Sequence, residues 1–147
     1  MDKNEVVSKI NKYIHLSTKI LAEWLVDKLP RLSNDWWTEC VLDKLSYNQR
    51  MIAEEKSFSA LSDFDLAALL RITDKNWYAL NEIVWLPTKE RECVRKMVSV
   101  RNNWAHCAGT LPGRDAIVSD VNTIVQFLGQ LNCDMQLFRE VNIFILR

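Results

Sequence analysis

The sequence predicts an all-α fold, a helical bundle of at least five helices. The 147-residue chain contains only three Gly and three Pro, so few residues interrupt helices. Apolar residues recur every three or four positions along most of the chain, which is the spacing of amphipathic helices. Six Trp and five Phe supply large apolar side chains, and a chain of this length can bury a core without disulfides or metal ions. We therefore expect a single domain over residues 1–147.

The first 45 residues predict two helices. Apolar residues at helical spacing run through residues 6–29, and Pro30 ends this helix. Ser33 or Asn34 offers an N-cap for the second helix, because a short polar side chain can accept a hydrogen bond from the first turn. The expected buried face of that helix consists of Trp36, Trp37, Cys40, Val41 and Leu45.

The middle of the chain predicts shorter helices. Over residues 47–62 we expect a helix followed by a loop near residues 57–62. Ser62 or Asp63 can cap a helix over residues 64–72, and Thr73 or Asp74 can cap a further one. Helical spacing then continues through residues 76–86 as far as Pro87. The sequence leaves open whether these last two segments are separate helices or one bent helix.

The central helix is expected to start after Thr88, a suitable cap, and to continue through residues 96–109. Gly109 suits the left-handed position that follows a helix end. The expected buried side of this helix consists of Cys93, Met97, Val100, Trp104 and Cys107.

The last third of the chain predicts a turn at Pro112 and Gly113, followed by amphipathic helices over residues 114–131 and 134–146. The chain finishes on Ile-Phe-Ile-Leu-Arg without a polar tail. From this ending we expect a domain excised from a longer protein.

Composition narrows the function. Nineteen basic and nineteen acidic side chains cancel, so any site for a polyanion must be local. The four Cys form no closely spaced pair and are expected to be reduced, and no metal site or cofactor is expected. No stretch reads as a signal peptide or membrane span, so we expect a cytoplasmic protein with no membrane partner. A local basic excess does occur on the central helix, where Arg95 and Lys96 are weak candidates for binding RNA phosphates.

Arg101, Asn102 and His106 stand out near the end of the central helix. Asn102 and His106 are four residues apart and share a helix face, whereas Arg101 and His106 point about 140° away from each other. Arg101 must therefore reach around the helix or meet a histidine of another subunit. Glycine-rich phosphate loops, zinc-binding helices, nucleophile elbows and calcium loops are absent from the sequence.

These three residues resemble the hallmark of the HEPN domains, Arg-x(4 to 6)-His at a helix end with a polar residue straight after the Arg. A second stretch, from Leu61 to Trp77, resembles the branch found in an RNA-surveillance endonuclease and at the N-terminus of bacterial helicase-like or ATPase proteins. Many members have an acidic residue shortly before the Arg, where this chain has Val98, Ser99 and Val100.

The resemblance implies metal-independent cleavage of RNA by a homodimer formed through the motif helix, with Arg101, Asn102 and His106 as catalytic residues. The expected chemistry is attack by the RNA 2′-hydroxyl, which leaves a 2′,3′-cyclic phosphate and a 5′-hydroxyl. An imidazole can act as the base or the acid at neutral pH, and a guanidinium can bind phosphate oxygens.

Two alternatives stay open. Arg101 and His106 could merely interact with the carbonyl end of a helix dipole. The domain could also be a non-catalytic dimerisation or nucleotide- or RNA-sensing module of a larger helicase-like or defence protein. The neutral overall charge favours this second alternative, because a ribonuclease that captures RNA electrostatically is expected to be basic.

Overall fold

A computed structural model describes residues 3–105 and 111–131, and within them the chain forms six α-helices and no β-strand. The predicted all-α bundle is therefore confirmed. The predicted helix over residues 134–146 lies outside the described residues.

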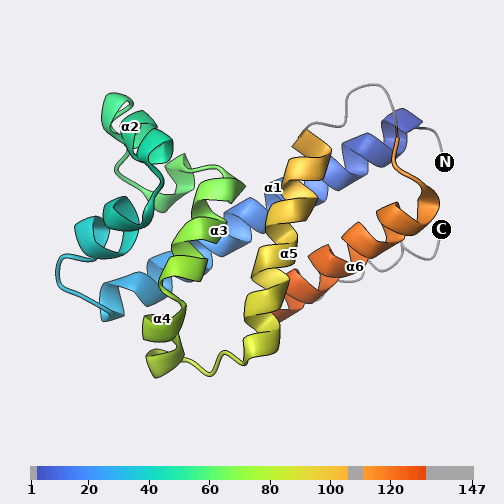
Figure 1. The fold of residues 1–147 in the computed structure, drawn as a ribbon. Coiled ribbons are helices and arrows are strands. Elements are labelled where there is room, and N and C mark those ends of the chain that lie inside the picture. Colours follow the sequence, from blue (N-terminus) through green and yellow to red (C-terminus); the bar gives the residue numbers. More distant parts are fainter. Residues whose placement is uncertain (1–2, 106–110, 132–147) are drawn as a thin grey trace.

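The long first helix, α1 (Lys3–Lys28), is the helix against which the other long helices pack. In Figure 1 it runs diagonally behind the later helices, and it contacts α3 (Leu66–Lys75), α5 (Thr88–Ala105) and α6 (Arg114–Gln130). Pro30 lies in the 3₁₀ turn η1 (Leu29–Arg31) that follows α1, as expected for a residue that ends a helix.

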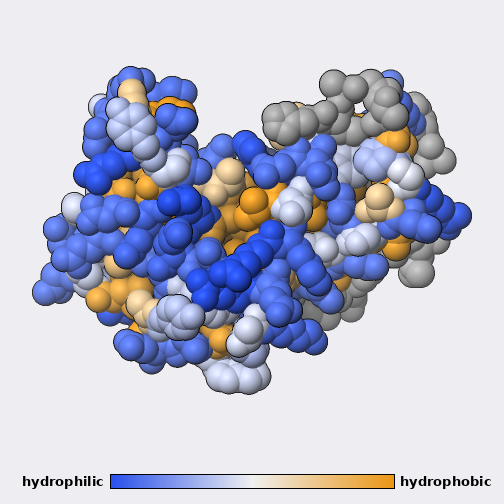
Figure 2. Space-filling model, in the orientation of Figure 1, coloured by the Kyte–Doolittle hydropathy of each residue, from blue (hydrophilic) through white to orange (hydrophobic). Residues whose placement is uncertain are grey.

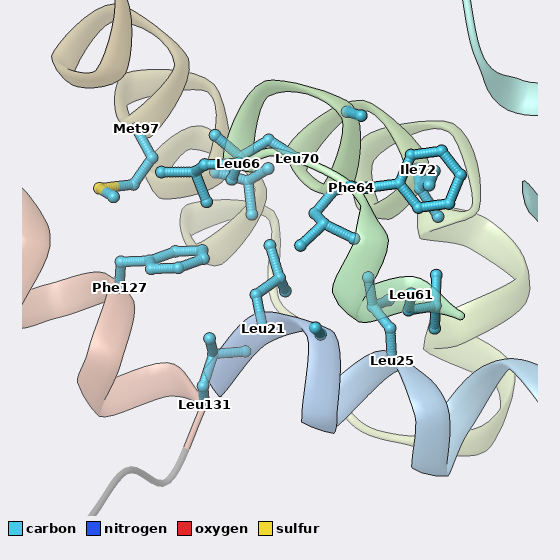
Figure 3. Close-up of a cluster of buried hydrophobic side chains, with 14 of the residues drawn as sticks. Leu21, Leu25, Leu61, Phe64, Leu66, Leu70, Ile72, Met97, Phe127 and Leu131 are labelled. Atoms are coloured by element: carbon cyan, nitrogen blue, oxygen red, sulfur yellow. The ribbon is translucent and has the colours of Figure 1, made fainter. Parts of the chain in front are cut away.

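The core lies between these four helices. Figure 3 shows side chains from all of them converging, with Leu21 of α1, Leu70 of α3, Met97 of α5 and Phe127 of α6 in one cluster. Each of these four side chains is fully buried. The hydrophobic effect of this cluster holds α5 in place, because α5 packs against both α3 and α6.

The expected second helix forms only in part. Residues Trp37–Val41 make one π-helical turn, η2, and Leu42–Lys44 make a 3₁₀ turn, η3. Neither Ser33 nor Asn34 caps them. Ser33 Oγ instead accepts a hydrogen bond from the Asp35 backbone N–H and donates one to the Glu39 carboxylate. It therefore stabilises the turn that precedes η2.

The next helix, α2 (Tyr47–Glu55), starts with a capping box: the Ser46 hydroxyl accepts from the Gln49 backbone, and the Gln49 side chain accepts from the Ser46 backbone. The short 3₁₀ turn η4 (Leu61–Asp63) follows, in the region expected to be a loop. In Figure 1, α2 lies at one end of the molecule, away from α6.

The predicted caps of the middle helices were wrong. Asp65, and neither Ser62 nor Asp63, caps α3, because its Oδ1 accepts from the Ala68 backbone N–H at 2.9 Å. Asp63 instead accepts from two backbone N–H groups just before η4. The difference decides where α3 begins and which carboxylate faces α5.

Asn76 separates α3 from α4 (Trp77–Ile83), so residues 64–86 contain two helices and not one bent helix. Neither Thr73 nor Asp74 caps α4, since both lie within α3. The buried Asn76 amide donates to the backbone carbonyls of Cys40, at 2.8 Å, and Ile72, at 2.7 Å. The side chain thereby satisfies the Cys40 carbonyl and connects η2 to the junction, whereas the Ile72 carbonyl also accepts from the backbone N–H of Asn76 at 3.1 Å.

Candidate active site

The central helix α5 presents one buried face and one exposed face. Its buried residues are Cys93, Val94, Met97, Val100 and Trp104. The Trp104 indole N–H donates to the Asp120 carboxylate of α6 at 2.9 Å. Thr88 is the first residue of the helix and not its cap. The end of α5 that carries the motif is thus anchored to α6 by burial and by a hydrogen bond.

Arg101 lies in the last described turns of α5 with its side chain 31% exposed. One terminal nitrogen, Nη2, lies 3.3 Å from Oδ2 of Asp65, and the other, Nη1, donates to Oδ1 of Asn102 at 3.1 Å. A guanidinium has five N–H donors, and these contacts use two of them. The group is therefore oriented by two oxygen atoms, and its other donors make no hydrogen bond to residues 3–105 and 111–131.

The partner of Arg101 was not predicted from the sequence. Asp65 precedes Arg101 by 36 positions, and its carboxylate performs two tasks, since one oxygen caps α3 and the other contacts the guanidinium. Asp65 lies within the stretch from Leu61 to Trp77 that resembles the HEPN branch, and this resemblance is the sequence feature that could have drawn attention to it. The acidic neighbour that Val98, Ser99 and Val100 do not supply comes instead from the start of α3.

Asn102 contacts Arg101 in this structure. The sequence placed it on the face of His106, as a residue that could orient the imidazole. His106 lies outside the described residues, so that role stays a prediction. Of the three predicted catalytic residues, the structure brings together Arg101 and Asn102.

Arg95 and Lys96, the candidates for phosphate binding, are both exposed on α5. Arg95 Nε lies 3.3 Å from the Asp74 carboxylate, which also accepts from Arg91 Nε at 3.0 Å. Lys96 forms no ion pair with any residue that the structure describes. Arg95 and Arg101 are six positions apart on the helix, about 9 Å along its axis, so a phosphate bound by Arg95 lies next to the site and not within it.

The sequence matches the family described as Swt1-like HEPN over residues 12–131. The chain belongs to this family. The match contains both Asp65 and Arg101, and it confirms the resemblance that the motif suggested. Comparisons with curated proteins and with solved structures found no match.

HEPN domains of this kind are RNA-related and nuclease-like. In this one, the two described cysteines are poor candidates for chemistry. Cys40 and Cys93 are buried free thiols, and burial raises the pKa of Cys93 to about 11. A thiol with so high a pKa stays protonated at neutral pH and is a weak nucleophile and metal ligand.

Potential metal ligands do not gather in this HEPN domain: residues 3–105 and 111–131 contain no group of three or more His, Cys, Asp or Glu that could hold an ion. The same residues include no helix long and apolar enough to cross a membrane.

Proposed function

We propose that this HEPN domain is a metal-independent endoribonuclease that acts as a homodimer. The observation that carries the proposal is the guanidinium of Arg101, which Asp65 and Asn102 hold at the partly exposed end of α5 in a chain of the Swt1-like HEPN family. Arg101 is thus presented as a fixed cation, as stabilisation of a developing phosphate charge requires.

In the proposed reaction, an imidazole of His106 takes the proton of the RNA 2′-hydroxyl. The 2′-oxygen forms a bond to phosphorus, and Arg101 binds the oxygens of the pentacovalent phosphorane. The bond from phosphorus to the 5′-oxygen then breaks, and a second protonated group gives that oxygen its proton. The products are a 2′,3′-cyclic phosphate and a 5′-hydroxyl, without any redox change.

The need for a second proton-transfer group supports the dimer. The other histidine, His15, lies on α1 and lines a groove between α1 and η4 that contains none of the motif residues. Arg95, Val98 and Asn102 are exposed and follow one another at helical spacing, so they form an uncovered stripe along α5. Pairing two copies of this stripe about a two-fold axis would bring two His106 and two Arg101 to a single cleft.

The test is cleavage of single-stranded RNA by the purified domain in the presence of a chelator. We expect cleavage with the stated end groups, and loss of cleavage in Arg101→Ala and in His106→Ala. Arg31→Ala is the matched control, because Arg31 is an exposed arginine in an ion pair with Asp27 of α1. It should cleave as the unaltered protein does.

RNA with a single 2′-deoxy substitution at the cleaved nucleotide tests the nucleophile. Cleavage at that bond should cease, because the attacking group is gone. An undiminished rate there would exclude attack by the 2′-hydroxyl and refute the mechanism.

The second candidate is a non-catalytic dimerisation or sensing module within a longer helicase-like or defence protein. The net charge of zero favours it, because RNA capture by charge alone is weak in a neutral protein. Binding of RNA by the domain with no cleavage under any of these conditions would support this candidate.

A further inference from the structure

A cavity lies between α2 and the start of α3. Its volume is about 290 Å³, enough for one nucleobase. The lining includes Gln49, Ile52 and Lys56 from α2, and Phe58, Asp63 and Asp65 from the segment that leads into α3. In Figure 2 the surface is hollowed beside α2, over the beginning of α3.

This cavity adjoins the candidate active site through one carboxylate. Asp65 lines the cavity, and its Oδ2 lies 3.3 Å from the guanidinium of Arg101. A phosphate bound by Arg101 would therefore stand at the mouth of the cavity. The base of a nucleotide that adjoins this phosphate could then reach into the cavity.

The walls have the chemistry of a base-binding site. Phe58 is half-buried and meets Phe64 edge to face, with ring centroids 5.1 Å apart, so its ring is fixed as an apolar surface. Ile52 adds an apolar side chain that is 46% exposed. Planar bases bind proteins largely by stacking on such surfaces.

The polar atoms of the lining offer both donors and acceptors. The Gln49 side-chain oxygen accepts from the Ser46 backbone, and its amide nitrogen makes no hydrogen bond to the described residues. Lys56 is exposed and forms no ion pair with them. Oδ1 of Asp63 accepts no hydrogen bond from the described residues and is an available acceptor, because the two backbone N–H groups that Asp63 binds both donate to its Oδ2. Base edges carry ring and exocyclic groups of both kinds, which such a lining can match.

We propose that this cavity binds the nucleobase next to the scissile phosphate and so contributes to the choice of cleavage site. The inference rests on the proposed ribonuclease function, and it adds a base-binding subsite formed by α2 and the start of α3. Arg101 binds the phosphate group, which is the same in every nucleotide, whereas the cavity contacts the part that differs.

The test obstructs the cavity with a larger side chain. Ile52→Trp places a large ring at its rim, and Met51→Trp is the matched control, since Met51 is the preceding residue of α2, is 39% exposed and does not line the cavity. Three RNA substrates are compared. The first has a single cleaved bond, the second has an abasic ribonucleotide on the 5′ side of that bond, and the third has one on the 3′ side. An abasic ribonucleotide retains the 2′-hydroxyl but has no base.

We expect the unaltered protein to cleave one abasic RNA roughly tenfold more slowly than the intact RNA, because a stacked base contributes a factor of about this size. Ile52→Trp should cleave the intact RNA roughly tenfold more slowly and should lose little more on the abasic RNA. Met51→Trp should behave as the unaltered protein does. If Ile52→Trp fails to fold, Lys56→Ala removes a donor from the rim instead and should change the preferred base next to the cut.

Two results would overturn the subsite while leaving the ribonuclease function intact: equal cleavage of all three RNAs by the unaltered protein, or equal sensitivity of Ile52→Trp and the unaltered protein to the missing base. If the unaltered protein cleaves no RNA, the proposed function fails. The subsite is then tested by binding of 2′-O-methyl RNA with and without the base. A base-independent affinity in that assay would refute the subsite as well.

Discussion

Substitution of Asp65 separates the two tasks of its carboxylate. Asp65→Ala removes the N-cap of α3 and the contact with Arg101, whereas Asp65→Asn keeps an oxygen that can cap the helix and removes the charge. A lost N-cap costs about 1 kcal/mol of the free energy of unfolding. The ion pair is partly exposed, with Asp65 at 61% and Arg101 at 31%, so it contributes only about 0 to 1 kcal/mol.

The expected loss of unfolding free energy is thus about 1 to 2 kcal/mol for Asp65→Ala and below about 1 kcal/mol for Asp65→Asn. Urea unfolding followed by tryptophan fluorescence measures both, with an unchanged slope against urea as the sign that the native state is intact. Asp27→Asn is the control for an exposed ion pair alone, because Asp27 pairs with Lys28 and Arg31.

Cleavage by Asp65→Asn should fall by a factor of about 2 to 10, since one orienting hydrogen bond contributes about 0.5 to 1.5 kcal/mol. If Asp65→Asn destabilises the protein as much as Asp65→Ala does, the cap is not the main contribution and the assignment is wrong. If its cleavage rate equals that of the unaltered protein, Asp65 does not position Arg101.

Four further predictions concern other residues. Asn102→Ala should slow cleavage by no more than about tenfold, because it removes an orienting hydrogen bond and not a proton carrier. A heterodimer of unaltered and His106→Ala chains, purified with two different tags, should lose far more than half of the activity if both copies serve one cleft. Between about pH 9 and pH 11 the unfolded chain loses the Cys93 proton while the folded chain keeps it, so stability should fall with rising pH. The loss is about 1.4 kcal/mol for each unit of difference in pKa, and Cys93→Ala should lack it. Asn76→Ala should lower the free energy of unfolding by about 1 to 2 kcal/mol, because the Cys40 carbonyl loses its donor while the Ile72 carbonyl keeps the backbone N–H of residue 76.

Each of these predictions has an outcome that contradicts it. Complete loss of cleavage in Asn102→Ala would make Asn102 essential to the chemistry. A heterodimer with half of the activity, or an active monomer by light scattering at micromolar concentration, would rule out the composite cleft. Identical alkaline unfolding of Cys93→Ala and the unaltered protein would show that Cys93 titrates normally. Unchanged stability of Asn76→Ala would mean that water replaces the amide.

Periodicity predicted the long helices because their buried faces repeat over many turns. Residues 6–29 and 114–131 correspond to α1 and α6 within a few positions. Caps were harder to predict, because Ser62, Asp63 and Asp65 compete within four residues. Burial of Phe64 before the helix and of Leu66 inside it decides the competition, and that burial depends on contacts with the rest of the bundle.

The site was predictable only where its residues are neighbours in the sequence. Arg101 and Asn102 are adjacent, so a local motif identified them. Asp65 reaches Arg101 only because α3 and α5 pack side by side, and the cavity beside Asp65 requires α2 as well. No local pattern encodes these distances, since packing of distant helices sets them.

The placement of α1 determines when the molecule can finish folding during its synthesis. Leu21 of α1 faces Phe127 and Leu131 (Figure 3), which the ribosome adds more than a hundred residues later. At usual rates of translation that interval is about 5 to 20 s. Leu25 acquires its neighbour Leu61 earlier, so the end of α1 near η4 can be covered first. The part of its apolar stripe that packs against α6 is covered only after α6 has been made, so a nascent chain arrested after α5 should leave Leu21 partly exposed to chaperones and proteases.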